Sequence, residues 1–239
     1  MPNSSPHNIN TWLTQINNDY KAAVSVDCVI FGYDDDALKV LVSKCDMPPF
    51  EREYSLLGDL VHPDETTDEA ALRVLEKKSG FKDVFLEQVQ VFSDKDRHPL
   101  GRVITVAYYS LIQINDDHLK HIEPSASLRW IDIKDVKSLA FDHLKIMNLC
   151  LTKMQKEISE RPIGFKLLPE KFSLLELQRL YEVILDISLD KRNFRRKLKS
   201  MDVLKDIGET QESVSHRPAR LYAFNDNNTK SKTEISFSL

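Results

Sequence analysis

The chain has 239 residues, of which 41% are hydrophobic and 29% charged, and its formal net charge is −4. These values are typical of a soluble globular protein with one large domain or two modest ones. No apolar run approaches the roughly 20 residues that a membrane-spanning helix needs, and the polar N-terminus lacks the apolar core of a secretory signal. The three cysteines have no metal-ligand spacing and indicate reduced thiols. We therefore expect a cytoplasmic protein that uses no membrane, metal or cofactor.

Residues 1–19 are rich in Ser, Asn and Pro, and we expect them to form a flexible segment. A β-hairpin is predicted next, because 23–33 (AVSVDCVIFGY) and 38–43 (LKVLVS) are dense in β-branched and aromatic residues around an aspartate-rich turn. Asp27 is disfavoured inside a strand, so it either faces water or serves a polar site. Three further strands are predicted, at 84–92, 103–112 and 128–133.

Two helices are predicted in the same part of the chain. The first begins after Thr66, which forms a capping box with Glu69, and ends at Gly80, a residue suited to a left-handed cap. The second spans 141–160, where Leu and Met recur on one stripe, a pattern that indicates core packing more often than a ligand site. The run RPIG at 161–164 then ends the helix and indicates a domain boundary.

The stretch 173–201 predicts two helices joined by a short turn, and the second is strongly basic. Ser173 and Glu176 form another capping box, and Asp190 is a good N-cap for the second helix. Six lysines and arginines and that one aspartate give the second helix a net charge of +5. Phe194 and Leu198 are its apolar residues and are expected to pack it against the rest of the protein. A helix with a narrow apolar stripe and an otherwise basic surface suits insertion into a DNA groove. The alternative to DNA binding is that this basic face is simply solvated.

A second β-hairpin is predicted from arms at 203–208 and 219–224, and a polar tail follows at 225–239. Two helices and a hairpin make a winged helix-turn-helix. We predict that polar side chains of the basic helix contact bases and phosphates, and that the wing reaches the backbone or the minor groove. The predicted DNA-binding residues are Lys191, Arg192, Asn193, Arg195, Arg196, Lys199 and, in the wing, Arg217.

The segment 58–81 (GDLVHPDETTDEAALRVLEKKSGF) resembles the Nudix box, a pattern of an acidic residue, an arginine, three helix carboxylates and a closing glycine. Glu65 and Arg73 match the acidic residue and the arginine. The three carboxylates, which gather Mg²⁺ for diphosphate hydrolysis, are replaced by Val74, Lys77 and Lys78. A valine and two lysines offer no oxygen ligand and repel a dication. The chain is therefore expected to keep the fold without being an enzyme.

Five motifs extend the resemblance over nearly all of residues 20–224. They are DRHPLGR at 96–102, AFDHLKI at 140–146, LLPEKFSLLELQRLYEVIL at 167–185, DKRNFRRKL at 190–198 and RPARLYAF at 217–224. With them the chain is similar to the Nudix-related transcriptional regulators, both the NrtR type, which senses ADP-ribose, and sugar-responsive relatives such as the arabinose repressor. The resemblance implies an α+β fold, with a Nudix-like α/β/α sandwich and mixed sheet at 20–160 and a winged helix-turn-helix at 161–224.

The same resemblance implies a ligand-responsive repressor that binds palindromic operator DNA as a homodimer. The run PIGFKLLPEKFSL and the eroded box favour the sugar-sensing branch, so a pentose such as arabinose is the expected effector. ADP-ribose or a related nucleotide, in NAD metabolism, is the alternative. A Nudix-family hydrolase is the less favoured interpretation.

An effector site is implied near the box and the connection at 93–102. The candidate residues are Asp27, Tyr54, Asp96, Arg97, Arg102, Asp142 and His143. Carboxylates in this set suit sugar hydroxyls and its cations suit a diphosphate, so the set does not choose between the two ligands. Asp96 and Arg97 could instead close a turn, and Asp142 could cap the helix that follows.

Overall fold

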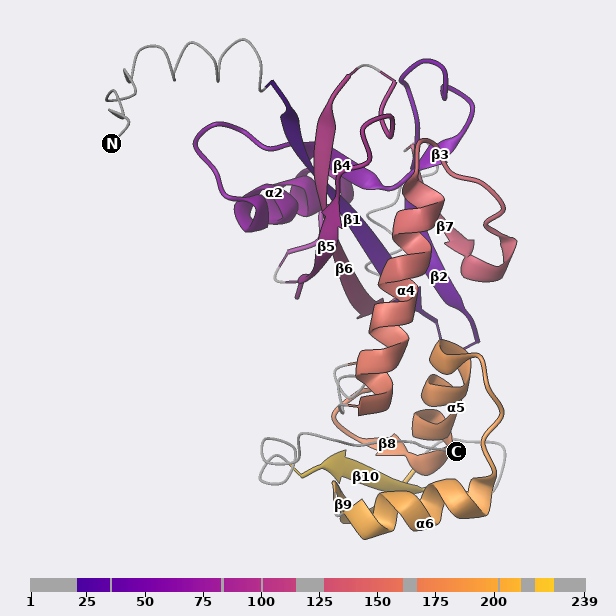
Figure 1. The fold of residues 1–239 in the computed structure, drawn as a ribbon. Helices are drawn as coiled ribbons and strands as arrows, with labels where there is room; N and C mark the ends of the chain where they lie inside the picture. The colour runs from indigo at the N-terminus through magenta and orange to yellow at the C-terminus, as the bar shows by residue number, and fades with distance from the viewer. Residues whose placement is uncertain are drawn as a thin grey trace, which may run out of the picture.

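The computed structural model describes residues 21–34, 36–82, 84–99, 101–114, 127–160, 167–201, 203–211 and 218–225. Within these ranges the chain forms two units, and helix α4 (His143–Glu160) runs from the upper unit toward the lower one in Figure 1. No helix of these ranges is long and apolar enough to cross a membrane. The predicted boundary at 161, the segment 1–19, the wing residue Arg217 and the tail beyond Asn225 lie outside the described residues.

The upper unit is built on a mixed sheet. Its elements are β1 (Ala23–Tyr33), β2 (Leu38–Lys44), β3 (Tyr54–Ser55), β4 (Leu57–Leu60), α2 (Thr67–Ser79), β5 (Glu87–Phe92), β6 (Val103–Gln113), β7 (Leu128–Asp132), the short helix η1 (Ile133–Asp135) and α4. The strand order is β3-β2-β1-β6-β5, with β4 also paired to β1 and β7 to β2. Strands β1 and β6 run parallel over their whole length, whereas β2 and β4 pair with β1 in the antiparallel sense.

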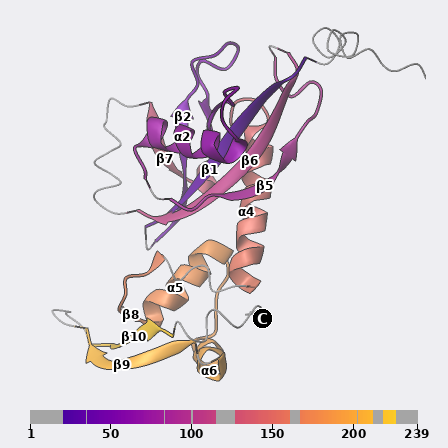
Figure 2. The ribbon, with the colours of Figure 1, turned by 90° about the vertical axis from the view of Figure 1, so that its left-hand side faces the viewer.

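The alternation of side chains along β1 divides the core into two layers. Val26, Cys28 and Ile30 point to the face covered by α2, and Val29 and Phe31 point to the face covered by α4. The expected α/β/α sandwich with a mixed sheet is therefore confirmed, and Figure 2 shows α2 and α4 on opposite sides of the strands. Asp27 belongs to the α4 side by the same alternation, where the side chains of Arg97 and His143 lie next to its carboxylate.

The lower unit is a winged helix. It contains β8 (Phe172–Ser173), α5 (Leu174–Leu185), α6 (Lys191–Met201), β9 (Leu204–Thr210) and β10 (Arg220–Phe224), and the three strands form a sheet in the order β8-β10-β9. The capping boxes predicted at Thr66 and Ser173 are both present. Gly80 takes the expected left-handed cap with φ of 75°.

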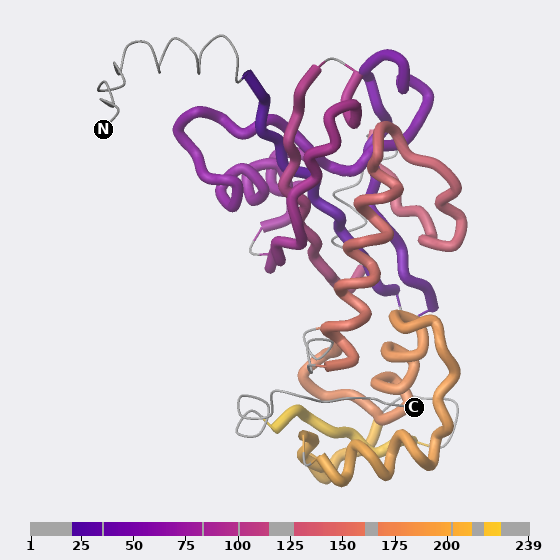
Figure 3. The backbone as a smooth tube through the Cα atoms, viewed as in Figure 1, coloured from indigo at the N-terminus to yellow at the C-terminus, as the bar shows by residue number. Residues whose placement is uncertain are grey.

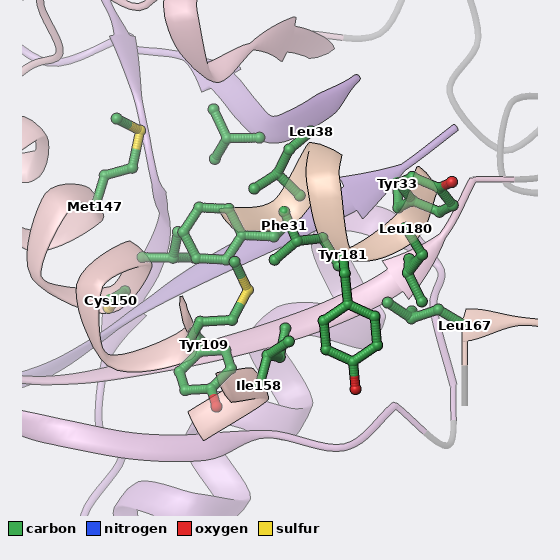
Figure 4. Packing of buried hydrophobic residues seen from close by; sticks show 14 of the residues in the cluster. Phe31, Tyr33, Leu38, Tyr109, Met147, Cys150, Ile158, Leu167, Leu180 and Tyr181 are labelled. Atoms are coloured by element: carbon green, nitrogen blue, oxygen red, sulfur yellow. The ribbon is translucent and has the colours of Figure 1, made fainter. Parts of the chain in front are cut away.

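One hydrophobic core continues from the upper unit into the lower one. Ile158 of α4 belongs to the same cluster as Phe31 of the sheet and Leu180 and Tyr181 of α5 (Figure 4). Met154 of α4 is a further member of this cluster. Polar contacts follow the same path, because Gln155 Nε2 donates a 2.9 Å hydrogen bond to the carbonyl of Ile184. The tube view in Figure 3 shows α5 packed beside the lower half of α4.

Some predicted boundaries are wrong. No strand was predicted between residue 43 and the helix after Thr66, but this stretch contains β3 and β4, and Phe172 and Ser173 form the unpredicted β8. These strands are too short to show an alternating pattern, and pairing with distant strands decides them. The helix predicted from residue 141 begins at His143, because Phe141 has a left-handed backbone with φ of 57°.

Candidate effector cavity and DNA-binding surface

A cavity of about 1010 Å³ opens beside the start of α4 in the upper unit. Strand β4 can approach β1 at its wall because residue 58 is glycine: a Cβ there would lie 2.1 Å from Oδ1 of Asp27 and 2.8 Å from the carbonyl of Val26. The charged residues and histidines that line the cavity are Asp27, Lys44, Asp46, Glu51, Asp59, Lys78, Arg97, His98, Arg102 and His143.

Arg97 is the centre of a buried polar network at this cavity. Its guanidinium binds both carboxylate oxygens of Asp142, with Nε 3.0 Å from Oδ2 and Nη2 2.7 Å from Oδ1. Nη1 donates to Oγ1 of Thr105 at 2.5 Å, and Nη2 lies 3.4 Å from Oδ2 of Asp27. The Arg97 side chain is only 3% exposed, so its charge is held by two carboxylates, as buried charges must be.

His143 is buried next to this network, and burial favours its neutral form. Its Nδ1 accepts a 3.0 Å hydrogen bond from the backbone N–H of Leu56, so the ring proton of the neutral form is on Nε2. That Nε2 lies 3.6 Å from Oδ1 of Asp27. Burial lowers the pKa of His143, and the nearby Asp27 opposes this shift only in part.

Aromatic rings form another wall of the cavity. Phe141 stacks on His98 with an angle of 7° between the rings and a centroid distance of 5.0 Å. Phe50 packs against the ring of Phe141, with a centroid distance of 4.6 Å. Burial also lowers the pKa of His98. A flat ligand group would find an aromatic stacking surface here.

The box segment is held in place by an ion-pair network around Arg73. Arg73 binds Glu65 with Nη2 2.6 Å from Oε1, and its Nη1 lies 3.2 Å from Oδ2 of Asp59. The hydrogen bonds from Arg73 lower the pKa of Glu65 to about 2. Val74 is buried in the core, and Lys77 is exposed. Among the described residues, no group of three or more His, Cys, Asp or Glu side chains is arranged to hold a metal ion.

Five of the predicted effector residues are brought together here. The residues of this set that line the cavity are Asp27, Arg97, Arg102 and His143. Asp142 does not line it but forms an ion pair with Arg97. The carboxylate of Asp142 therefore binds the guanidinium of Arg97. Arg97 also closes a turn, as the alternative interpretation expects, through a 3.3 Å hydrogen bond from its N–H to the carbonyl of Asp94. Its role toward an effector stays a prediction.

Tyr54 and Asp96 lie outside the cavity lining. The carbonyl of Tyr54 accepts a 2.8 Å hydrogen bond from the N–H of Ala140, and its side chain packs against the hydrophobic core. The side chain of Asp96 is 87% exposed and faces Lys95. The sequence interpretation missed Lys44, Lys78, His98 and Phe141, of which Lys78 was visible in the box but was interpreted only as a lost metal ligand.

The basic helix α6 has the geometry that its sequence predicts. Phe194 and Leu198 are 4% and 3% exposed and seat the helix. Asp190 caps it, with Oδ1 accepting a 2.8 Å hydrogen bond from the N–H of Asn193. The polar residues of α6 that were predicted to bind DNA are all exposed: Lys191, Arg192, Asn193, Arg195, Arg196 and Lys199. Arg196 donates a 2.8 Å hydrogen bond to Oδ1 of Asn193, so these two side chains form one polar unit on the surface.

A Nudix-like sandwich with a polar cavity, joined to a winged helix that exposes a basic helix, defines a class of two-domain DNA-binding regulators. Residues 164–224 match the family model described as the NrtR DNA-binding winged helix domain. The chain is also 29% identical over 212 residues to the ADPR responsive transcriptional repressor NtrR of Acinetobacter baylyi, a match that covers 87% of this chain and 84% of the relative.

Further relatives match one or both domains. An ADP-ribose pyrophosphatase of Methanocaldococcus jannaschii is 30% identical over 125 residues, covering 52% of this chain and 70% of that protein. The crystal structure of Shewanella oneidensis NrtR with a 27mer DNA has a TM-score of 0.73 and 29% identity, over 87% of this chain and 95% of that one. The NUDIX domain of the same protein with ADP ribose has a TM-score of 0.51 and 25% identity, over 62% of this chain and 99% of that one.

The chain belongs to the NrtR-type Nudix-fold regulators with a C-terminal winged-helix DNA-binding domain.

Proposed function

We propose that this protein is a transcriptional repressor that binds operator DNA through α6 and the wing, and that ADP-ribose in the cavity of the Nudix-like domain controls that binding. The observation that carries the proposal is the joining of a polar cavity to a winged helix through one helix, α4. The proposed DNA contacts are the exposed polar residues of α6, together with Arg217. A homodimer on a palindromic operator remains part of the proposal, because two-fold symmetry matches two half-sites.

ADP-ribose is favoured over a pentose by the cavity and by the relatives. A cavity of about 1010 Å³ suits a dinucleotide-sized ligand, and a pentose would leave most of it empty. Lys44, Lys78 and Arg102 offer positive charge to a diphosphate, and Phe141 with His98 offers a stacking surface to a base. A relative is named as ADPR responsive, and a related NUDIX domain was solved with ADP ribose. These observations support the alternative effector and not the arabinose that the sequence favoured.

We expect no hydrolysis of the bound nucleotide. The Nudix fold family implies Mg²⁺, but the positions that would hold it are occupied by a buried valine and two lysines. The carboxylates that remain nearby, Glu65 and Asp59, are bound to Arg73. One relative is named as a pyrophosphatase, so the activity has to be tested on this chain directly.

Helix α4 is the proposed route from the cavity to the DNA-binding unit. Its N-terminus carries His143 at the cavity, next to Asp142 on Arg97, and Gln155 and Ile158 contact the winged helix through the shared core. A ligand that binds better to one placement of α4 than to another would shift the placement of α6.

Fluorescence anisotropy on the upstream DNA of the protein's own gene tests this function. ADP-ribose is expected to change operator affinity, whereas arabinose and other pentoses are expected to leave it unchanged. Release of AMP and ribose phosphate with Mg²⁺ present is followed in parallel and is expected to be absent. A pentose effect without an ADP-ribose effect would contradict the effector assignment, and nucleotide turnover would contradict the absence of catalysis.

A further inference from the structure

Lys78 reverses the charge at a position of the box that carries a carboxylate in the Nudix pattern. Its side chain lines the cavity, and its Nζ donates a 2.6 Å hydrogen bond to the carbonyl of Gly58. This contact fixes the ammonium group at the wall formed by β4. The two other altered box positions differ from it, since Val74 is buried in the core and Lys77 does not line the cavity.

The charge of Lys78 is available to a ligand. Its acceptor is a neutral carbonyl, and it makes no ion pair with any residue in the described part of the chain. Asp59 of the box segment, whose carboxylate is also favoured electrostatically by Lys78, is hydrogen-bonded to Arg73 through Oδ2 and to the N–H of Leu60 through Oδ1. Arg97 is different, because Asp27 and Asp142 already balance its guanidinium.

We infer that Lys78 supplies the positive charge that a divalent cation supplies in a metal-dependent site, and that it binds the diphosphate of the ligand directly. This inference rests on the proposed function for the class of ligand. An ammonium group has three donors, of which one is used on Gly58, so two remain for phosphate oxygens. Lys44 and Arg102 line the same cavity and add to the positive charge, whereas Asp46 and Glu51 oppose it. Nucleotide binding is therefore independent of Mg²⁺.

Isothermal titration calorimetry of the full chain with ADP-ribose, in EDTA and in excess Mg²⁺, tests the inference. The wild-type protein is expected to bind equally in both buffers. Lys78→Gln is expected to weaken binding about tenfold or more, the loss typical of a charge-assisted hydrogen bond, and Lys78→Arg is expected to keep most of it. Lys77→Gln, a change of the neighbouring exposed lysine, is the matched control and is expected to bind like the wild type. Equal melting temperatures establish that the variants fold.

The outcomes separate the inference from the function on which it rests. Binding that requires Mg²⁺, or equal affinities of Lys78→Gln and Lys77→Gln, overturns the role of Lys78 and leaves an ADP-ribose sensor in place. A wild-type protein that does not bind ADP-ribose in either buffer overturns both proposals.

Discussion

Arg97 joins three parts of the chain at the cavity: β1 through Asp27, β6 through Thr105, and the start of α4 through Asp142. Because its guanidinium is buried, each of these contacts matters more than a surface ion pair would. The network therefore fixes the geometry of the cavity before any ligand enters. Its residues position one another, whereas Lys78 and Arg102 each donate a hydrogen bond to a neutral carbonyl, which leaves their charge for a ligand.

Removal of Arg97 tests this role. Arg97→Ala leaves Asp27 and Asp142 without their cation and is expected to cost about 3 to 5 kcal/mol of unfolding free energy, the usual cost of breaking a buried ion pair. Urea unfolding measures it. Arg102→Ala is the control, because this arginine donates to the carbonyl of Ser93 at an exposed position, and its cost is expected to be within about 0.5 kcal/mol. Equal costs for the two variants would contradict a structural role of the network.

The two histidines that line the cavity predict how stability depends on pH. Burial lowers the pKa of both His143 and His98 below the ordinary value of 6.5, so the unfolded chain takes up protons more readily than the folded one. Their contribution to stability is complete above about pH 6.5 and is lost as the pH falls below that value. The pKa of Glu65, about 2, leaves that carboxylate charged throughout this window.

Melting temperatures between about pH 7.5 and about pH 5.5 measure this dependence. The melting temperature of the wild-type protein is expected to fall toward the acid end of this range. The melting temperature of His143→Gln is expected to fall less over the same range. His62→Gln changes an exposed histidine, whose side chain is 55% exposed, and should keep the wild-type slope. An unchanged slope in His143→Gln would show that this histidine is not held neutral by the fold.

The elements differ in how far the sequence predicted them. Strand β1 and helices α2, α5 and α6 carry their own signals, namely β-branched runs, capping boxes and a basic face, and all four lie where they were expected. The short strands β3, β4 and β8 carry no local pattern, since each exists through pairing with a distant strand. The site follows the same rule. Asp27 could be identified from the sequence as a polar residue in a strand. The position of Phe141 at the cavity depends on a left-handed backbone, which no sequence motif predicts.

Helix α6 predicts a definite response of DNA binding to salt. Its exposed cations would release counterions from DNA, so the logarithm of the affinity falls linearly with the logarithm of the salt concentration. The slope of this line is about −0.9 for each phosphate contact. The double variant Arg195→Ala and Arg196→Ala is expected to reduce both the affinity and this slope, the slope by up to about 2. Lys77→Ala with Lys156→Ala removes the same charge elsewhere and serves as the control. Unchanged operator binding in the double variant would contradict the assignment of α6.

The whole molecule is held together by the core that α4 shares with α5 (Figure 4). A continuous core predicts that the two units unfold together and not one after the other. The same continuity gives a ligand in the upper unit a physical connection to α6, because the cavity and the winged helix both contact α4.

Two leucines of α5 test the cooperativity. Leu180 is 1% exposed in the shared core, and Leu180→Ala is expected to cost about 2 to 5 kcal/mol. The effect should appear in the fluorescence of Trp130, which lies in the upper unit. Leu175 is 53% exposed, and Leu175→Ala should have little effect. An early transition seen by circular dichroism, with no change in the tryptophan signal, would mean that the units unfold independently.

The most direct test of the central claim is the affinity for ADP-ribose measured with and without bound operator DNA. If one chain couples the two sites, the factor by which ADP-ribose changes operator affinity must equal the factor by which operator DNA changes ADP-ribose affinity. Calorimetric titration of ADP-ribose into the free protein and into the protein–operator complex provides both values. The account predicts different affinities, with a ratio that matches the anisotropy measurement. Equal affinities in the two titrations would contradict an effector-controlled regulator, even if each ligand bound tightly alone.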